Sequence, residues 1–103
     1  APMGPYLVTA DEIDDPQKLS INLWVNEDLK QSFNSDDMAH KIPRIIEWVS
    51  SIHELEPGDV IATGTPGGVG DARTPPRYLT DGVEIVTAVE GIGECRNVCR
   101  AVR

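Results

Sequence analysis

The sequence predicts a mainly β, α+β domain with one principal helix. Turn-forming residues divide the 103-residue chain at close intervals, and most of the short runs between them are rich in β-prone residues. One longer run instead repeats apolar residues at the period of a helix. The chain contains no internal repeat or low-complexity tract, and its length suits a single domain.

The first third of the chain is expected to form short strands. Residues 6–9 make a β-prone run bounded by a proline and by an acidic, turn-rich stretch. Residues 20–26 alternate apolar and polar side chains, as a strand with one buried face does. Residues 26–28 favour the tip of a hairpin that returns through residues 29–33.

A helix is expected at about residues 42–53. Apolar side chains recur there at helical spacing, at Ile42, Ile45, Ile46, Val49 and Ile52. Pro43 suits the first turn, where the missing N–H has no helical partner to lose. A proline-glycine turn ends the segment, and residues 59–63 predict a compact, buried strand.

The second half begins with a long loop that is rich in glycine and proline, at residues 64–76. Two further β-prone runs follow at residues 83–89 and 95–102, separated by a glycine-containing turn at 91–93. Short strands around one helix are typical of an α+β fold.

Composition disfavours several classes of function. Seventeen acidic residues against nine basic ones leave a net charge of −8, which argues against binding to nucleic acid or to an anionic membrane surface. No run approaches the roughly 18 apolar residues of a membrane span. Two cysteines cannot form a disulfide framework, so we expect a cytoplasmic location. The opening Ala1-Pro2-Met3 and the five aromatic residues lead us to expect part of a longer polypeptide.

The loop at residues 63–70 is the most specific feature, with two threonines and four glycines in eight residues. Glycines allow close approach of a backbone to a ligand and can direct successive N–H groups at an anion. The loop therefore suits a carboxylate or a phosphate. It lacks the Lys-Ser/Thr of a phosphate-binding Walker loop, and the proline-rich chain after it does not fit a dinucleotide fingerprint. A tight surface turn is the alternative interpretation.

Other polar residues give weaker signals. Three acidic pairs are expected to be solvated or to cap turns and helices: Asp11/Glu12, Asp14/Asp15 and Asp36/Asp37. His40 and His53 have no companion at metal-ligand spacing. Cys95 and Cys99 would lie about 13 Å apart along a strand, too far to share a metal ion. Trp24 and Trp48 are interpreted as packing residues.

The run LEPGDVIATGTPGGVG at residues 55–70 closely resembles the signature of the fumarylacetoacetate hydrolase family. Three other stretches agree in order and spacing: PMGPYLVTADEI at 2–13, LWVN at 23–26 with 34–38, and VEGIG at 89–93 with Arg96-Asn97. The resemblance covers nearly the whole chain. It implies a mixed β-roll with few helices, in a protein that forms a homodimer.

The resemblance also implies chemistry on small-molecule 2-oxo acids with Mg²⁺ or Mn²⁺. Members hydrolyse C–C bonds in acylpyruvates and fumarylacetoacetate, isomerise or hydrate unsaturated oxo-diacids, or decarboxylate oxaloacetate. The family's metal-binding carboxylates and its lysine precede the stretch at which this chain begins. We therefore expect residues 1–103 to be the C-terminal portion of one catalytic domain, with no catalytic residue and no metal ligand of its own.

What carries over from the family is Thr65, with the backbone of Gly64, as the grip on the substrate carboxylate. The missing metal-binding portion would come from an N-terminal segment or a second chain, and the 103 residues alone are expected to show no metal-dependent turnover. The alternative is a non-catalytic, β-rich scaffold or binding module that keeps the fold and lacks the metal site.

Overall fold

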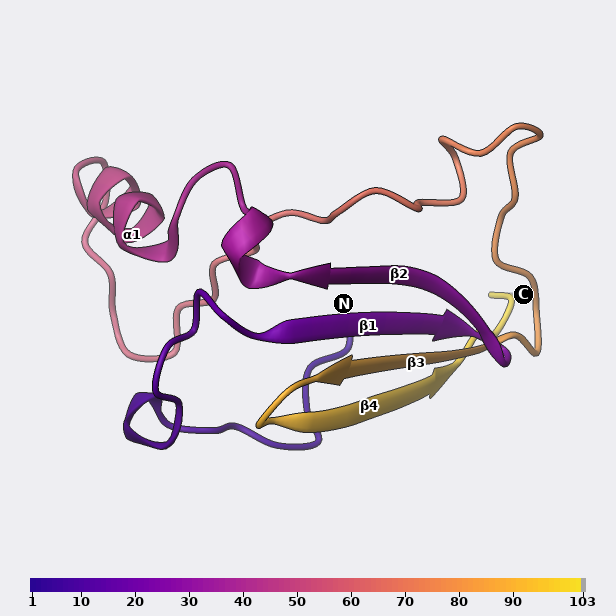
Figure 1. Ribbon diagram of the computed structural model, residues 1–103, viewed down its shortest axis with the longest axis horizontal. Coiled ribbons are helices and arrows are strands. Elements are labelled where there is room, and N and C mark those ends of the chain that lie inside the picture. The colour runs from indigo at the N-terminus through magenta and orange to yellow at the C-terminus, as the bar shows by residue number, and fades with distance from the viewer. Residues whose placement is uncertain (103) are drawn as a thin grey trace.

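The computed structural model describes residues 1–102 and is built around one four-stranded antiparallel sheet (Figure 1). The strands are β1 (Ser20–Val25), β2 (Asp28–Asn34), β3 (Glu84–Val89) and β4 (Gly93–Val98), in the order β2-β1-β3-β4. One α-helix, α1 (Ile42–Ser50), and two 3-10 turns, η1 (Ala10–Glu12) and η2 (Ser35–Asp37), complete the fold. The prediction of a mainly β, α+β fold with one principal helix is confirmed.

The β1–β2 hairpin forms where the sequence places its tip. Val25 and Asp28 pair across a two-residue turn, in which Asn26 adopts a positive φ of 53°. Asparagine tolerates this left-handed conformation better than most residues. Asn26 also ties the turn to β3, because its backbone N–H donates to the Glu84 carbonyl at 2.7 Å and its side-chain oxygen accepts from the Glu84 N–H at 3.1 Å.

The sheet buries little of its apolar surface within the described part of the chain. Val86, in β3, is 6% exposed and Ser35 is 3% exposed; across residues 1–102 these two residues alone count as buried. Large apolar side chains lie open to solvent, among them Tyr6, Leu7, Ile52, Val60 and Tyr78. Figure 1 shows why: the sheet is a single layer with coil on its flanks. Such extensive exposed apolar surface usually marks a contact with further protein.

The helix confirms the predicted stripe but ends earlier than expected, at Ser50 instead of residue 53. Two serines at its C-terminal end donate hydrogen bonds to helix carbonyls. Ser51 Oγ, just after the helix, donates to the Trp48 carbonyl at 2.6 Å, and Ser50 Oγ donates to that of Glu47 at 3.1 Å. Such back-bonding competes with continued helix formation. Trp48 does not pack within residues 1–102, where the residue is 61% exposed.

Two predicted strands are absent from the described residues. Residues 6–9 and 59–63 are extended coil, and neither segment pairs with a strand within residues 1–102. Leu7 is 94% exposed and Val60 is 67% exposed, so residues 59–63 are also not buried. Apolar, β-branched composition favours a strand, but a strand also needs a neighbour for its N–H and C=O groups. The last predicted strand begins at Gly93 and ends at Val98, which leaves Cys99 outside it.

No helix within residues 1–102 is long and apolar enough to cross a membrane.

Candidate functional site

The loop that follows α1 runs alongside β2, one of the two outer strands of the sheet, before it reaches β3 (Figure 1). Residues 63–66 of this loop line a groove of about 600 Å³. The lining is largely apolar where it comes from the sheet and from the segments at the start of α1: Ile21, Phe33, Met38, Ala39 and Ile45. The polar part of the lining comes from the loop, through Thr63, Gly64 and Thr65, and from Asp37 and His40. The loop thus forms a polar wall, and the rest of the groove lining is apolar apart from Asp37 and His40.

Gly64 and Thr65 both lie on this wall and are exposed. Gly64 has a φ of +100°, a conformation that side-chain-bearing residues rarely adopt. The Thr65 hydroxyl oxygen accepts a hydrogen bond of 3.1 Å from the side-chain amide of Gln31, in β2. The same amide nitrogen lies 3.1 Å from the Pro66 carbonyl oxygen and 3.2 Å from that of Gly67. One side chain of the sheet therefore anchors three consecutive residues of the loop.

Gln31 carries no signal in the sequence that would mark it as part of the site. Thirty-four residues separate it from Thr65, and a lone glutamine in a strand forms no pattern. It reaches the loop beside an irregularity in the hairpin: Leu23 pairs with Gln31 and Trp24 with Leu29, so Lys30 has no opposite residue on β1. Such a bulge redirects neighbouring side chains. The bulge explains how an edge-strand side chain and a backbone carbonyl both face the loop.

Two glycines of the loop serve close contacts within the chain itself. A Cβ on Gly68 would lie 2.4 Å from the Lys30 carbonyl oxygen, and one on Gly70 would lie 1.9 Å from that of Arg77. Sequence reasoning assigned these glycines to the approach of a ligand. The structure instead shows that Gly68 lets the loop press against β2, and that Gly70 lets the loop fold back on itself. By contrast, a Cβ on Gly64 or Gly67 would meet nothing within 4 Å.

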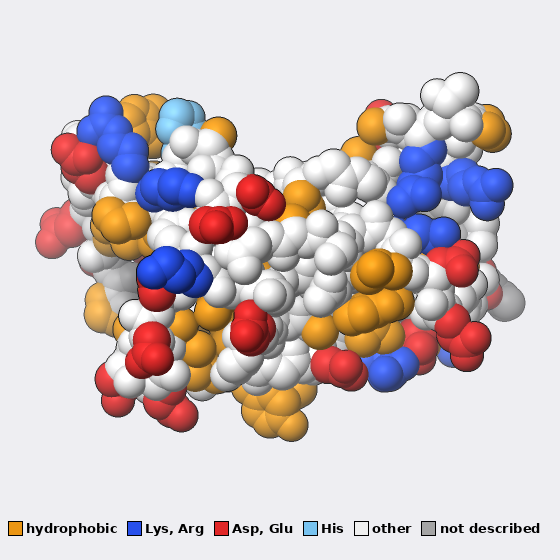
Figure 2. Space-filling model, viewed as in Figure 1, with side chains coloured by type: hydrophobic (Ala, Val, Ile, Leu, Met, Phe, Trp, Pro, Cys, Tyr) orange, Lys and Arg blue, Asp and Glu red, His pale blue; other side chains and the backbone are white. Residues whose placement is uncertain are grey.

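Arg73 is a second anchor of the loop. Its guanidinium donates to the Gly68 carbonyl at 2.9 Å and to the Lys30 carbonyl at 3.4 Å, and so joins the loop to the bulge. Lys30 itself pairs with Asp28 at 3.0 Å, and this hydrogen bond lowers the pKa of the Asp28 carboxyl. These residues and Arg77 line a second groove of about 400 Å³. Figure 2 shows basic side chains gathered at this end of the molecule.

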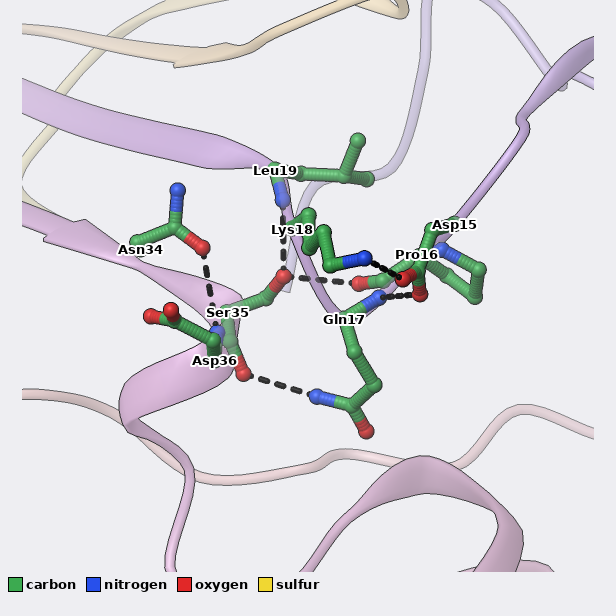
Figure 3. A network of polar contacts seen from close by, with 8 residues as sticks. All are labelled: Asp15, Pro16, Gln17, Lys18, Leu19, Asn34, Ser35 and Asp36. Carbon is green, nitrogen blue, oxygen red and sulfur yellow. Dashed lines mark hydrogen bonds and ion pairs between the residues drawn. The ribbon is translucent and has the colours of Figure 1, made fainter.

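A polar network around Ser35 lies just before the groove residues Asp37 and Met38 in the chain (Figure 3). The Ser35 hydroxyl donates to the Pro16 carbonyl at 2.7 Å and accepts from the Leu19 N–H at 2.9 Å. The Gln17 amide nitrogen donates to the Ser35 carbonyl at 2.7 Å, and its oxygen accepts from the N–H of Ile42, the first residue of α1. The network therefore holds the entry to β1, the end of β2 and the start of α1 together.

The acidic pairs take the structural roles expected of them. Asp11 and Glu12 lie in η1, and Asp36 and Asp37 lie in η2. Asp15 accepts from the Gln17 N–H at 2.9 Å in a turn, and the Lys18 ammonium bonded to it lowers the pKa of its carboxyl. Within residues 1–102, no three His, Cys, Asp or Glu side chains converge as metal ligands would. The described residues therefore do not fit a divalent ion by themselves.

The remaining candidates stay apart from one another. His40 lies in the lining of the first groove, whereas His53 lies 3.6 Å from Asp59 near the end of α1. Cys95 and Cys99 are both free thiols.

The sequence matches the family model described as "Fumarylacetoacetate (FAA) hydrolase C-terminal" over residues 1–100. The chain belongs to the fumarylacetoacetate hydrolase family. This confirms the resemblance carried by residues 55–70 and the shorter stretches.

Solved members of the family superpose closely on the chain. Fumarylacetoacetate hydrolase from psychrophilic Exiguobacterium antarcticum is 43% identical, with a TM-score of 0.92, and the match covers 98% of this chain and 36% of that one. Maleylpyruvate hydrolase from Sphingobium sp. SYK-6, in complex with manganese(II) and pyruvate, is 40% identical, with a TM-score of 0.88 and coverage of 97% and 35%. A 5-carboxymethyl-2-hydroxymuconate delta-isomerase from Mycobacterium smegmatis is 39% identical, with a TM-score of 0.81 and coverage of 97% and 36%.

The family therefore contains both hydrolases and isomerases, and one relative binds a divalent metal together with pyruvate. The chain spans about a third of the length of the curated relatives it matches.

Proposed function

We propose that this chain is the C-terminal portion of a divalent-metal-dependent enzyme that acts on 2-oxo acids. Its reaction is the hydrolysis of a C–C bond in an acylpyruvate or in a substrate resembling fumarylpyruvate or fumarylacetoacetate, or the isomerisation of an unsaturated oxo-diacid in aromatic catabolism. Membership of a family with hydrolases and isomerases supports this proposal, as does the relative that binds manganese(II) and pyruvate. The chain's span of a third of its relatives supports the assignment to a portion of the enzyme.

The exposed apolar side chains support the same division. Leu7 and Val60 belong to segments that have strand-like composition and no pairing partner in the described chain. In the complete enzyme, the remaining two thirds, or a second copy in a homodimer, would cover this surface. That part would also hold Mg²⁺ or Mn²⁺, which acts as a Lewis acid on a 2-oxo acid when bound.

Thr65 and the backbone of Gly64 would contribute the grip on the substrate carboxylate. Both lie on the polar wall of a groove whose apolar floor fits the carbon chain of an oxo acid. A hydroxyl that donates to a carboxylate makes a charge-assisted hydrogen bond, which is stronger than a neutral one. The position of Thr65 on this wall is the observation that carries the proposal.

Replacing Thr65 with valine tests the grip, because the change removes the hydroxyl and keeps the shape of the side chain. In the full-length, manganese-loaded protein, we expect the free energy of pyruvate binding to weaken by about 1–3 kcal/mol, from the lost bond to a charged group. Isothermal titration calorimetry measures this free energy of binding. Thr65→Ser, which retains the hydroxyl, should bind pyruvate nearly as the parent does. Equal affinity of Thr65→Val and the parent would remove Thr65 from the site, and absence of metal-dependent pyruvate binding in the parent would favour the non-catalytic scaffold.

A further inference from the structure

We propose that Gln31 is a positioning residue that aims the Thr65 hydroxyl proton at the substrate carboxylate. This inference rests on the proposed function, because it assigns the orientation of a group that the proposed function uses. It starts from the three contacts of one amide nitrogen, to Thr65 Oγ1, the Pro66 carbonyl oxygen and the Gly67 carbonyl oxygen.

The neighbours of the Gln31 amide fix which way it faces. The Pro66 and Gly67 carbonyl oxygens can only accept hydrogen bonds, so the amide must turn its NH₂ group towards them, and not its oxygen. The Thr65 oxygen lies 3.1 Å from that same nitrogen, which can only donate. Because the NH₂ group has two protons for three acceptors, one proton is shared between two of them. Thr65 must therefore be the acceptor in this bond.

An acceptor role for the Thr65 oxygen leaves its own proton for another partner. A threonine hydroxyl has one proton and two lone pairs, and Gln31 takes up a lone pair. The proton is then directed away from β2 and can meet a carboxylate placed in the groove. The bond from the amide also polarises the hydroxyl, because donating to an oxygen makes its own O–H a better donor.

The surroundings keep Gln31 in place for this role. The Lys30 bulge sets the direction of its side chain, and Arg73 holds the loop against the bulge through the Gly68 and Lys30 carbonyls. Arg73 has no contact with Thr65 among its hydrogen bonds. Gln31 and Arg73 thus both anchor the loop, but Gln31 alone of the two contacts the hydroxyl. This difference provides a matched control.

The test is a double-mutant cycle in the full-length, manganese-loaded protein, with pyruvate affinity measured by calorimetry. Gln31→Leu removes the donor, and the isosteric Gln31→Glu replaces it with an acceptor towards which the Thr65 proton would turn. We expect both to weaken pyruvate binding about five- to tenfold when Thr65 is present. In the Thr65→Val background, where there is no hydroxyl to aim, the further loss should be less than about twofold. Affinity for Mn²⁺ alone should not change.

Arg73→Leu is the control for loss of loop anchoring. Its effect on pyruvate affinity should be the same in the parent and in the Thr65→Val background, because Arg73 bonds only the backbone carbonyls of Gly68 and Lys30 and not the Thr65 hydroxyl. The inference is overturned if the Gln31 variants weaken binding equally in both backgrounds, if they leave affinity unchanged, or if both fail to fold while Arg73→Leu folds. If Thr65→Val itself leaves pyruvate affinity unchanged, the assignment of Thr65 to binding of the substrate carboxylate is contradicted as well. If Thr65→Val weakens pyruvate binding and the Gln31 variants do not, this inference is overturned and the proposed function is not.

Discussion

Replacing Gly68 with alanine is expected to destabilise the loop by about 2–4 kcal/mol, from backbone strain and steric overlap together. The φ of +103° at Gly68 disfavours any residue with a Cβ, and the added Cβ would lie 2.4 Å from the Lys30 carbonyl oxygen. The obstacle is backbone of β2, which cannot rotate away as a side chain could. The loop would have to lift from β2, and the contacts of Gln31 and Arg73 with it would be lost.

The neighbouring Gly67 provides the control for this change. A Cβ there meets nothing within 4 Å, and Gly67 is not among the glycines with positive φ. Gly67→Ala should therefore leave both stability and the loop unchanged. The measurements are the thermal midpoint of the full-length protein and the rate of proteolytic cleavage within residues 64–79. If Gly68→Ala resists heat and protease as well as Gly67→Ala does, the close contact between Gly68 and the β2 backbone is contradicted.

Replacing Ser35 with alanine should lower the free energy of unfolding by about 2–3 kcal/mol, because buried partners lose their hydrogen bonds. Ser35 is 3% exposed, and its hydroxyl serves both the Leu19 N–H and the Pro16 carbonyl. Neither group has another hydrogen-bond partner within residues 1–102. The loss should loosen the joint between β1, β2 and α1.

Urea unfolding of the full-length protein measures this effect. Ser32 provides the matched control, since it is an exposed serine in β2, the strand that ends just before Ser35, and Ser32→Ala should change stability little. A second readout is pyruvate affinity, which Ser35→Ala should reduce less than Thr65→Val does, because Ser35 does not line the groove. Equal stability of the two serine variants would contradict the structural role given to the network.

The elements that the sequence predicted correctly depend on short-range signals. The alternation of Ile21, Leu23 and Val25 and the two-residue turn at Asn26 suffice for a hairpin, because register follows from turn geometry. The stripe from Ile42 to Val49 similarly suffices for α1. The two strands that are absent, at 6–9 and 59–63, had equally good local composition. The absence of these two strands shows that a segment forms a strand only beside another strand that pairs with it, and composition does not identify that partner.

The candidate site was predictable in part. Glycine density located the loop at residues 63–70, but the roles of Gly68 and Gly70 depend on distances to Lys30 and Arg77 that no spacing reveals. Gln31 lacked any sequence signal, since its contact with Thr65 depends on a bulge in β2 and on the course of a loop far along the chain. Family resemblance pointed to Thr65, whereas the residues that hold it in place required the structure.

The position of the loop along β2 has a consequence for the behaviour of the protein in concentrated solution. An outer strand presents unpaired N–H and C=O groups, which invite addition of a strand from another molecule and so promote aggregation. Arg73 occupies the Lys30 carbonyl, and the close approach of Gly68 leaves no room there for an incoming backbone. The segment that carries Thr65 thus also covers β2 at Lys30, so variants that loosen it would expose this part of the strand to self-association.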